Sequence, residues 1–186
     1  MKIEINQKKF AFIQDKYEIL VDEKLTYKAK SDLFTFGSRI GIFNLNEKEI
    51  GTVEKEFEFP AEPYPKYTLS FGTYSSSRML TISNNHYRLF ATQGAIDIYG
   101  QKGRKLGIFL NDVQVGLIDK SKKAIFGGDN YTIKIESSAI EKELIIAFVL
   151  AFDDFFHSKG TMLSYDFGNI FIDPVKEIDP AWEPKN

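Results

Sequence analysis

The sequence predicts a mainly β protein, in which a closed barrel of about twelve strands surrounds one buried hydrophobic helix at about residues 138–159. Three observations predict this fold. Short runs of alternating apolar and polar residues fill most of the chain, and one block of strand-like sequence occurs twice. A helix-like segment without a polar face then follows both copies.

The composition is that of an ordinary globular protein with a single domain. The chain has 186 residues, of which 43% are hydrophobic and 27% are charged. This length is sufficient for one hydrophobic core. We therefore expect one domain over residues 1–186, with two pseudo-repeated halves at about 10–75 and 80–136, the central helix at 138–159 and an extended C-terminal tail at 160–186.

Charge and cysteine content argue against several classes of partner and site. The net charge of −2 and the pI near 5.8 disfavour a nucleic-acid binder, which needs a basic face to neutralise phosphates. Because the chain has no cysteine, disulfides, thiolate metal sites and palmitoylation are excluded. The first nine residues mix polar and apolar types and lack the apolar stretch of a secretory signal, so we expect a cytoplasmic protein.

Strand-like sequence begins near residue 2 and continues to about residue 135. The 17 Phe and 9 Tyr support this interpretation, because both residue types favour pleated, half-buried surfaces. Alternation is clearest at residues 67–71, 95–99 and 131–135, where every second residue is apolar. Strands with this pattern have one face on a core.

One block occurs at residues 41–53 and again at residues 107–118. Both copies begin Gly-Ile-Phe and place an Asn and an acidic residue between two apolar runs, which is typical of a hairpin. Two flanking blocks match in the same order: Tyr17-Glu18-Ile19 with Tyr87-Arg88-Leu89, and Tyr67-Thr68-Leu69 with Tyr131-Thr132-Ile133. Unrelated hairpins also look alike, but three ordered matches favour an internal repeat.

The helix-like segment has signals at both predicted ends. Ser138 and Glu141 have the spacing of a capping box, which satisfies backbone donors at a helix start. At the other end His157 and Lys159 complement the helix dipole, and Gly160 is placed to end the helix.

The middle of this helix, residues 144–152, is apolar on every side, so it must be buried in protein or in a membrane. A membrane span needs about 20 apolar residues, and this run is about half as long, so we expect no transmembrane segment. About twelve strands are expected to close into a barrel or to form a strongly bent pair of sheets, and a barrel of twelve strands is too wide to be filled by its own side chains. The helix is therefore predicted to fill the barrel.

Two strand-rich halves followed by a late apolar helix that ends Ala-Phe-Asp-Asp-Phe-Phe resemble the tubby C-terminal-like superfamily, and within it the LURP-one-related proteins. The resemblance covers about residues 9–157 and rests on order and pattern. It implies a closed barrel of about twelve strands around a hydrophobic helix. Tubby-type domains bind phosphoinositide head groups, and phospholipid scramblases share the proposed fold. The lipid-binding residues of tubby cannot be aligned here, and the cysteine-rich segment of scramblases is missing.

Two basic clusters in the second half are the candidate ligand-binding residues. They are Lys102, Arg104 and Lys105 in one turn and Lys120, Lys122 and Lys123 in the next. Together they could contact phosphate or an anionic lipid at a membrane surface. Solvated hairpin loops with lysines that protect sheet edges are the interpretation that we favour for these residues, because Lys and Arg are mostly exposed in any soluble protein.

Asp153 and Asp154 follow the apolar run, near a helix end where the dipole favours cations. Asp153 could pair with His157 four residues later, or the carboxylates could accept hydrogen bonds from loop backbone. Two adjacent carboxylates are a weak metal signal, because calcium takes six to eight oxygen ligands. We therefore favour a structural role and predict no metal and no cofactor.

No nucleophile, base and orienting group can be assembled from the sequence, so we predict no enzyme. His86 and His157 fit no metal motif, and His86, beside two asparagines, is interpreted as a turn residue. The leading hypothesis is a non-enzymatic binding module for anionic phospholipid or phosphoinositide head groups. The alternative is a structural or protein-interaction domain that docks a partner through an exposed edge, aromatic loops or the segment around Trp182.

Overall fold

The computed structural model describes residues 1–10, 14–32, 39–56, 64–79, 86–91, 94–100, 105–120, 130–153 and 176–185. These residues form twelve strands and one helix: β1 (Lys2–Phe10), β2 (Gln14–Val21), β3 (Lys24–Asp32), β4 (Arg39–Asn44), β5 (Glu49–Glu56), β6 (Tyr64–Leu69), β7 (Gly72–Met79), β8 (His86–Ala91), β9 (Gly94–Gly100), β10 (Lys105–Leu110), β11 (Val113–Lys120), β12 (Asn130–Ile135) and α1 (Lys142–Ala151).

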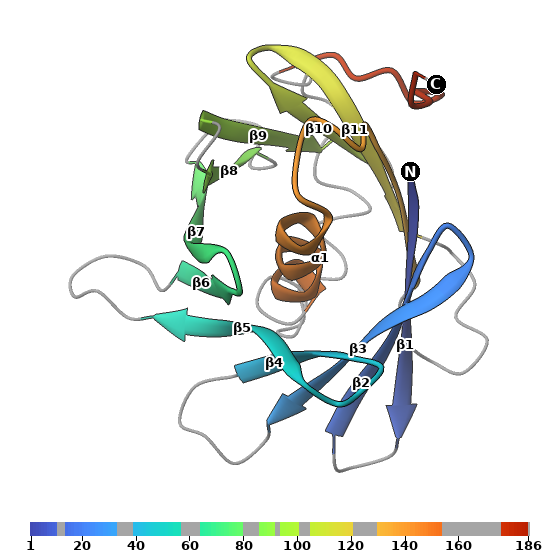
Figure 1. The fold of residues 1–186 in the computed structure, drawn as a ribbon. Coiled ribbons are helices and arrows are strands. Elements are labelled where there is room, and N and C mark those ends of the chain that lie inside the picture. The colour runs from blue at the N-terminus through green and yellow to red at the C-terminus, as the bar shows by residue number, and fades with distance from the viewer. Residues whose placement is uncertain are drawn as a thin grey trace.

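The twelve strands form a closed antiparallel barrel in which each strand pairs with its neighbours in sequence and β1 pairs with β12. In the view into the barrel in Figure 1, α1 lies inside the ring of strands. Closure pairs both edges of a sheet that would otherwise expose unsatisfied backbone groups. The predicted fold class, a mainly β barrel around a central hydrophobic helix, is confirmed.

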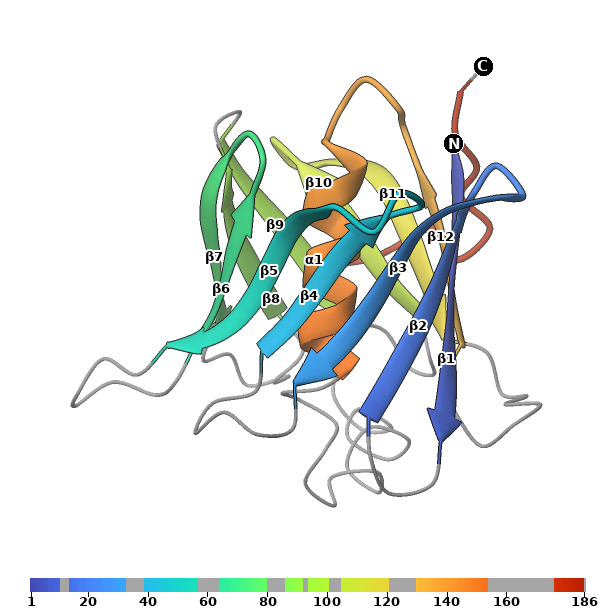
Figure 2. The ribbon, with the colours of Figure 1, turned by 60° about the horizontal axis from the view of Figure 1, so that its bottom comes forward.

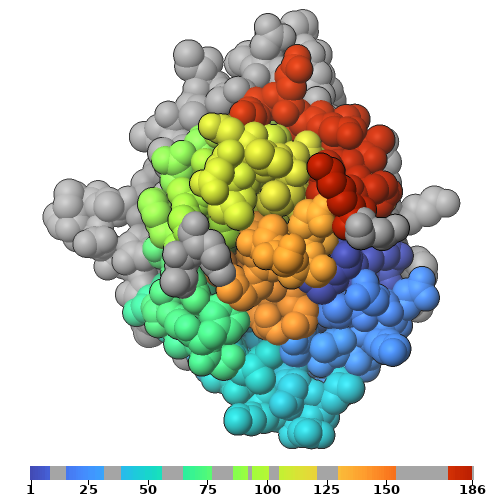
Figure 3. Space-filling model, turned by 45° about the horizontal axis from the view of Figure 1, so that its top comes forward, coloured from blue at the N-terminus to red at the C-terminus, as the bar shows by residue number. Residues whose placement is uncertain are grey.

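Because the strands run up and down, the barrel has two distinct ends (Figure 2). At the hairpin end, short turns join β2 to β3, β4 to β5, β6 to β7 and β10 to β11. The opposite end, the loop end, is where β9 and β11 finish and where β10 and β12 begin. The segment between β12 and α1 lies at the hairpin end, between the surrounding strands (Figure 3).

The helix begins at Lys142, four residues later than predicted, so the proposed capping box at Ser138 is wrong. Glu141 is the N-cap residue and makes no side-chain capping hydrogen bond. Before it, a turn in which Ala139 N–H donates to the Glu136 carbonyl carries the chain from the wall to the barrel axis. Ile140 is already part of the core, so the chain becomes helical only once it reaches the axis. The predicted C-terminal signals at residues 157–160 lie outside the described residues.

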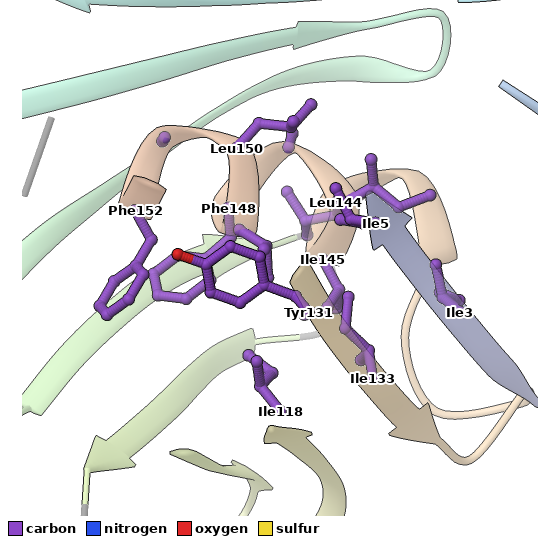
Figure 4. Close-up of a cluster of buried hydrophobic side chains, with 14 of the residues drawn as sticks. Ile3, Ile5, Ile118, Tyr131, Ile133, Leu144, Ile145, Phe148, Leu150 and Phe152 are labelled. Carbon is purple, nitrogen blue, oxygen red and sulfur yellow. The ribbon is translucent and has the colours of Figure 1, made fainter. Parts of the chain in front are cut away.

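The helix is buried on all sides, as the sequence predicted. Its residues from Leu144 to Ala151 are each at most 1% exposed. The Phe148 ring meets Tyr87 edge-on, with centroids 5.9 Å apart, and packs beside Phe152. Figure 4 shows Phe148 and Phe152 beside Tyr131, with isoleucines of the barrel wall around them. A barrel of this width thus obtains its core from the helix.

The two sequence copies form two hairpins, β4–β5 and β10–β11, with the same irregularity. In both hairpins a bulge adds one residue to the second strand, Ile50 in the first and Val115 in the second, just before a glycine. The downstream flank matches differently from the sequence alignment. The paired strands relate Leu69 to Ile135, because these residues pair with Gly51 and Gly116, whereas the sequence match relates Leu69 to Ile133.

Candidate functional site

Lys105 and Lys120 are the predicted ligand-binding residues that the structure describes, and both lie at the loop end. Lys105 opens β10 and its register partner is Asp119 of β11, the neighbour of Lys120. The remaining predicted residues lie outside the described part of the chain: Lys102, Arg104, Lys122 and Lys123. The strand register therefore brings the flanks of both basic clusters together.

Each of the two described lysines already has partners on the protein. The Lys105 ammonium donates a hydrogen bond to the Pro180 carbonyl at 2.6 Å and lies 3.8 Å from the Asp119 carboxylate. The Lys120 ammonium lies 5.5 Å from the centre of the Tyr131 ring, a cation–π contact. Lys105 points to the outer face of the barrel, whereas Lys120 lies against a core tyrosine.

A polar network at the loop end holds Asp153, which is only 7% exposed. Its carboxylate accepts hydrogen bonds from the Tyr131 hydroxyl at 2.7 Å and the Tyr17 hydroxyl at 3.0 Å. The Gln7 amide donates to the Tyr17 hydroxyl at 3.3 Å. Two tyrosine hydroxyls therefore supply hydrogen-bond donors to this buried carboxylate. Asp154 lies outside the described residues.

Sequence reasoning missed the two tyrosines, although both belong to the repeated blocks. Tyr17 and Tyr131 occupy inward-facing positions near the start of β2 and β12, so their hydroxyls reach the end of the central helix. Within the described residues, no group of three or more histidine or acidic side chains could hold a metal ion. The hydrogen bonds from Tyr17 and Tyr131 give Asp153 a structural role at the end of the helix.

A second polar cluster lies on the outer face of β8 and β9. The Asp97 carboxylate accepts two hydrogen bonds from Arg88, at 2.7 and 3.0 Å, and lies 2.7 Å from Nε2 of His86. Burial raises the pKa of Asp97, but the hydrogen bonds and charge of Arg88 and His86 outweigh burial and hold that pKa below its ordinary value.

His86 is a buried strand residue, so its interpretation as a turn residue is wrong. Its ring stacks on Tyr99 with centroids 4.3 Å apart. The stack on Tyr99 and the contact with Asp97 hold His86 against the barrel wall. Asp97 is brought beside His86 by the pairing of β8 with β9, which the sequence pattern alone does not specify. The contacts of His86 and Arg88 with Asp97 join β8 to β9.

The C-terminal residues 176–185 lie on the outer face of the second half, with a turn in which Trp182 N–H donates to the Asp179 carbonyl. Trp182 packs there against a small cluster of Phe109, Leu117 and Ile178. The aromatic residue that sequence analysis considered for partner docking therefore contacts the protein's own barrel.

No helix in the described part of the chain has both the length and the apolar character that a membrane crossing requires. The inward positions of the barrel are instead filled by the core around α1. The polar clusters described above lie at the loop end, around Asp153 and Lys105, and on the outer face of β8 and β9, around Asp97.

The family comparison agrees with the fold. A family model described as LURP-one-related matches residues 1–153, which include all twelve strands and the described part of the helix. Neither the curated proteins nor the solved structures include a significant match to the chain. Since the matched region covers most of the sequence and the barrel, the chain belongs to the LURP-one-related family.

Proposed function

We propose that this protein is a non-enzymatic binding module that contacts anionic phospholipid head groups with the loop end of its barrel. The observation that carries the proposal is the register between Lys105 and Asp119, which brings the flanks of the two basic clusters together on adjacent strands. Clustered lysines and arginines attract anionic lipid surfaces, each contributing about 1 kcal/mol near the membrane. Membership of the LURP-one-related family is consistent with a binding role.

The composition of the segments that connect strands at the loop end also supports a lipid contact there. The segments that join β9 to β10 and β11 to β12 contain Lys102, Arg104, Lys122 and Lys123 in the sequence. The segments that join β3 to β4 and β5 to β6 each contain two phenylalanines. Basic residues together with aromatic residues are the usual composition of peripheral membrane contacts.

Vesicle flotation tests this proposal. Wild-type protein is expected to float with vesicles of phosphatidylcholine that contain phosphatidylserine or a phosphoinositide, and to remain unbound with phosphatidylcholine alone. Arg104→Glu and Lys122→Glu are the informative changes, because Lys105 also holds the C-terminal segment. Each charge reversal should weaken vesicle binding by at least about fivefold, the equivalent of about 1 kcal/mol.

The matched control reverses charge at the opposite end of the barrel. Lys24 and Lys48 are exposed lysines beside hairpin turns. Lys24→Glu and Lys48→Glu change net charge equally and should leave flotation unchanged. Absence of wild-type binding to anionic vesicles, or equal losses at both ends, would rule out the proposed lipid contact.

A further inference from the structure

The strap, residues 176–185, lies on the outer face of β10 and β11, and Ile178 is its one buried side chain. Ile178 is 5% exposed and packs against Phe109 and Leu117. Figure 3 shows the strap along this side of the barrel, at the C-terminal end of the colour scale. The neighbouring strap residues Glu177 and Asp179 are exposed.

The seat of Ile178 depends on a glycine in the barrel wall. A Cβ atom at Gly107 would lie 2.5 Å from Cγ2 of Ile178 and 2.9 Å from the Phe109 ring. The first distance is shorter than real Cβ contacts, so any larger residue at this position would push Ile178 away. The glycine thus leaves the room that the Ile178 side chain occupies.

Polar side chains of the same face bind the backbone of the strap. The Gln114 amide oxygen accepts a hydrogen bond from Asp179 N–H at 2.8 Å, and its amide nitrogen donates to the Asp179 carbonyl at 3.2 Å. Lys105 donates to the Pro180 carbonyl at 2.6 Å. Hydrogen bonds to main-chain atoms combined with one side-chain seat are a recurring mode of peptide recognition.

On the corresponding face of the first hairpin, the equivalent side chains form ion pairs with one another. The shared bulge places Arg39 and Glu49 where the second hairpin has Lys105 and Gln114. Arg39 donates to both carboxylate oxygens of Glu49 at 2.8 Å and lies 3.3 Å from Glu54. In the second hairpin, the glutamine cannot form such an ion pair with Lys105, and both side chains bind the strap.

The strap has sequence features that define what the face can recognise. Ile-Asp-Pro occurs at residues 178–180 on the face, and the same tripeptide occurs six residues earlier at 172–174. The strap carries charges of both signs: Glu183 pairs with Lys134 of the barrel, and Lys176 pairs with Asp112 at 2.9 Å. The occupant is therefore a segment with an isoleucine followed by Asp-Pro, which turns after the aspartate, where Trp182 N–H donates to the Asp179 carbonyl at 3.3 Å.

We propose that the strap face, formed by Lys105, Gly107, Phe109, Gln114 and Leu117, is a peptide-binding site for Ile-Asp-Pro segments of partner proteins. The strap is the intramolecular occupant that such a partner displaces. Ile178 is the one buried strap side chain. The rest of the strap is held by the half-buried Trp182, by exposed ion pairs of Lys176 with Asp112 and of Lys134 with Glu183, and by exposed hydrogen bonds. Release therefore exposes little buried apolar surface.

Trp182, the single tryptophan of the chain, reports on strap release in the full-length protein. It is half-buried against the strap face, so its emission should shift to longer wavelength when the strap leaves. The probe is the synthetic peptide Lys-Glu-Ile-Asp-Pro-Ala, which corresponds to residues 176–181 and contains no tryptophan. Saturable red shift at millimolar peptide is expected, because the intramolecular strap competes at an effective concentration in that range. The same peptide with serine in place of isoleucine should cause no shift.

Binding of the fluorescein-labelled peptide, followed by anisotropy, tests the residues of the face. Ile178→Ala weakens the internal competitor by removing its buried side chain and should lower the half-saturating peptide concentration at least tenfold. Gln114→Glu loses the donor to the Asp179 carbonyl and should bind the peptide at least tenfold more weakly. Glu49→Gln is the reciprocal control on the first hairpin and should leave peptide binding unchanged. Gly107→Ala should abolish peptide binding, and Gln114→Glu keeps the test valid if that variant does not fold.

Three results would overturn the proposal. The first is failure of the labelled peptide to bind the Ile178→Ala protein at millimolar concentration. The second is equal peptide binding by Gln114→Glu and Glu49→Gln. The third is a wild-type dimer that disappears in Ile178→Ala, as measured by native mass spectrometry, since it would assign the strap face to a second copy of the chain.

Discussion

Two carboxylates tie the ends of the central helix to tyrosines of the barrel wall. Near the start of the helix, the Tyr27 hydroxyl donates to Glu143 at 2.6 Å. Near its other end, Tyr17 and Tyr131 donate to Asp153. A carboxylate removed from water is costly unless donors replace the water, so these pairs fix where the helix sits along the barrel axis.

Removing one donor from the buried carboxylate should destabilise the fold. Tyr131→Phe deletes the shorter of the two described hydrogen bonds to Asp153 and adds no bulk. We expect the free energy of unfolding, measured by urea denaturation, to fall by about 1–3 kcal/mol.

Tyr67→Phe is the comparison for this variant, because the equally buried Tyr67 hydroxyl is paired with the neutral Ser76 hydroxyl. Its loss should be smaller, since hydrogen bonds to charged groups are stronger than neutral ones. Equal losses in the two variants would contradict a charge-assisted contact at Asp153.

Glu143 should make stability depend on pH. Burial raises its pKa, but hydrogen bonds from Tyr27, the backbone and Lys142 outweigh burial, so its pKa lies below the ordinary 4.5. A lowered folded-state pKa contributes stability above pH 4.5 that is lost as the pH falls through the folded-state value. Urea denaturation at a series of pH values should show this loss, and Glu143→Gln should reduce the slope between pH 5 and pH 3, an interval of about two units around that pKa. An unchanged slope would show that Glu143 is not the titrating group.

At the scale of the element, the helix is a core component and its apolar residues cannot tolerate charge. Phe148 is fully buried and contacts Tyr87 and Phe152. Phe148→Ala should lower the free energy of unfolding by about 3–5 kcal/mol, because a cavity replaces the ring. Phe148→Asp buries an unpaired charge and should prevent folding.

Circular dichroism and expression as soluble protein test both changes at this position. Val113→Asp is a control on an exposed apolar residue in a hairpin, and it should leave folding intact. A soluble Phe148→Asp protein with a normal melting temperature would contradict the central position of the helix.

In the two hairpins, local sequence pattern predicted the strands but not their bulges. Apolar runs around an Asn and an acidic residue correctly indicated β4–β5 and β10–β11. The bulges at Ile50 and Val115 and the later start of the helix were not predicted, because they depend on neighbouring strands and on the position of the barrel axis.

At the scale of the whole molecule, two seams unite the halves. β1 pairs with β12, and β6 pairs with β7, so neither half has paired edges alone. The helix contacts β5 and β6, and its rings reach Tyr87 of β8. Both halves therefore depend on one core.

This shared core predicts cooperative unfolding of the barrel. Urea transitions followed by far-ultraviolet circular dichroism and by the near-ultraviolet tyrosine signal should coincide, because most buried tyrosines contact the common core. Residues 1–69 expressed alone should remain unfolded, since the open sheet has neither its partner edges nor the helix. Two separated transitions, or a folded half, would contradict this prediction.

The sequence by itself determined the strand-rich halves, the paired hairpins and an apolar helix too short to cross a membrane, because alternation, turn residues and hydrophobicity are local properties. Only the tertiary structure decided which groups meet across the barrel. Tyr17 and Asp153 are 136 residues apart, Tyr27 and Glu143 are 116 apart, and Lys105 and Pro180 are 75 apart. Such contacts depend on strand register and barrel closure, which no local pattern specifies. They hold the two ends of the helix in the barrel and the strap on its outer face.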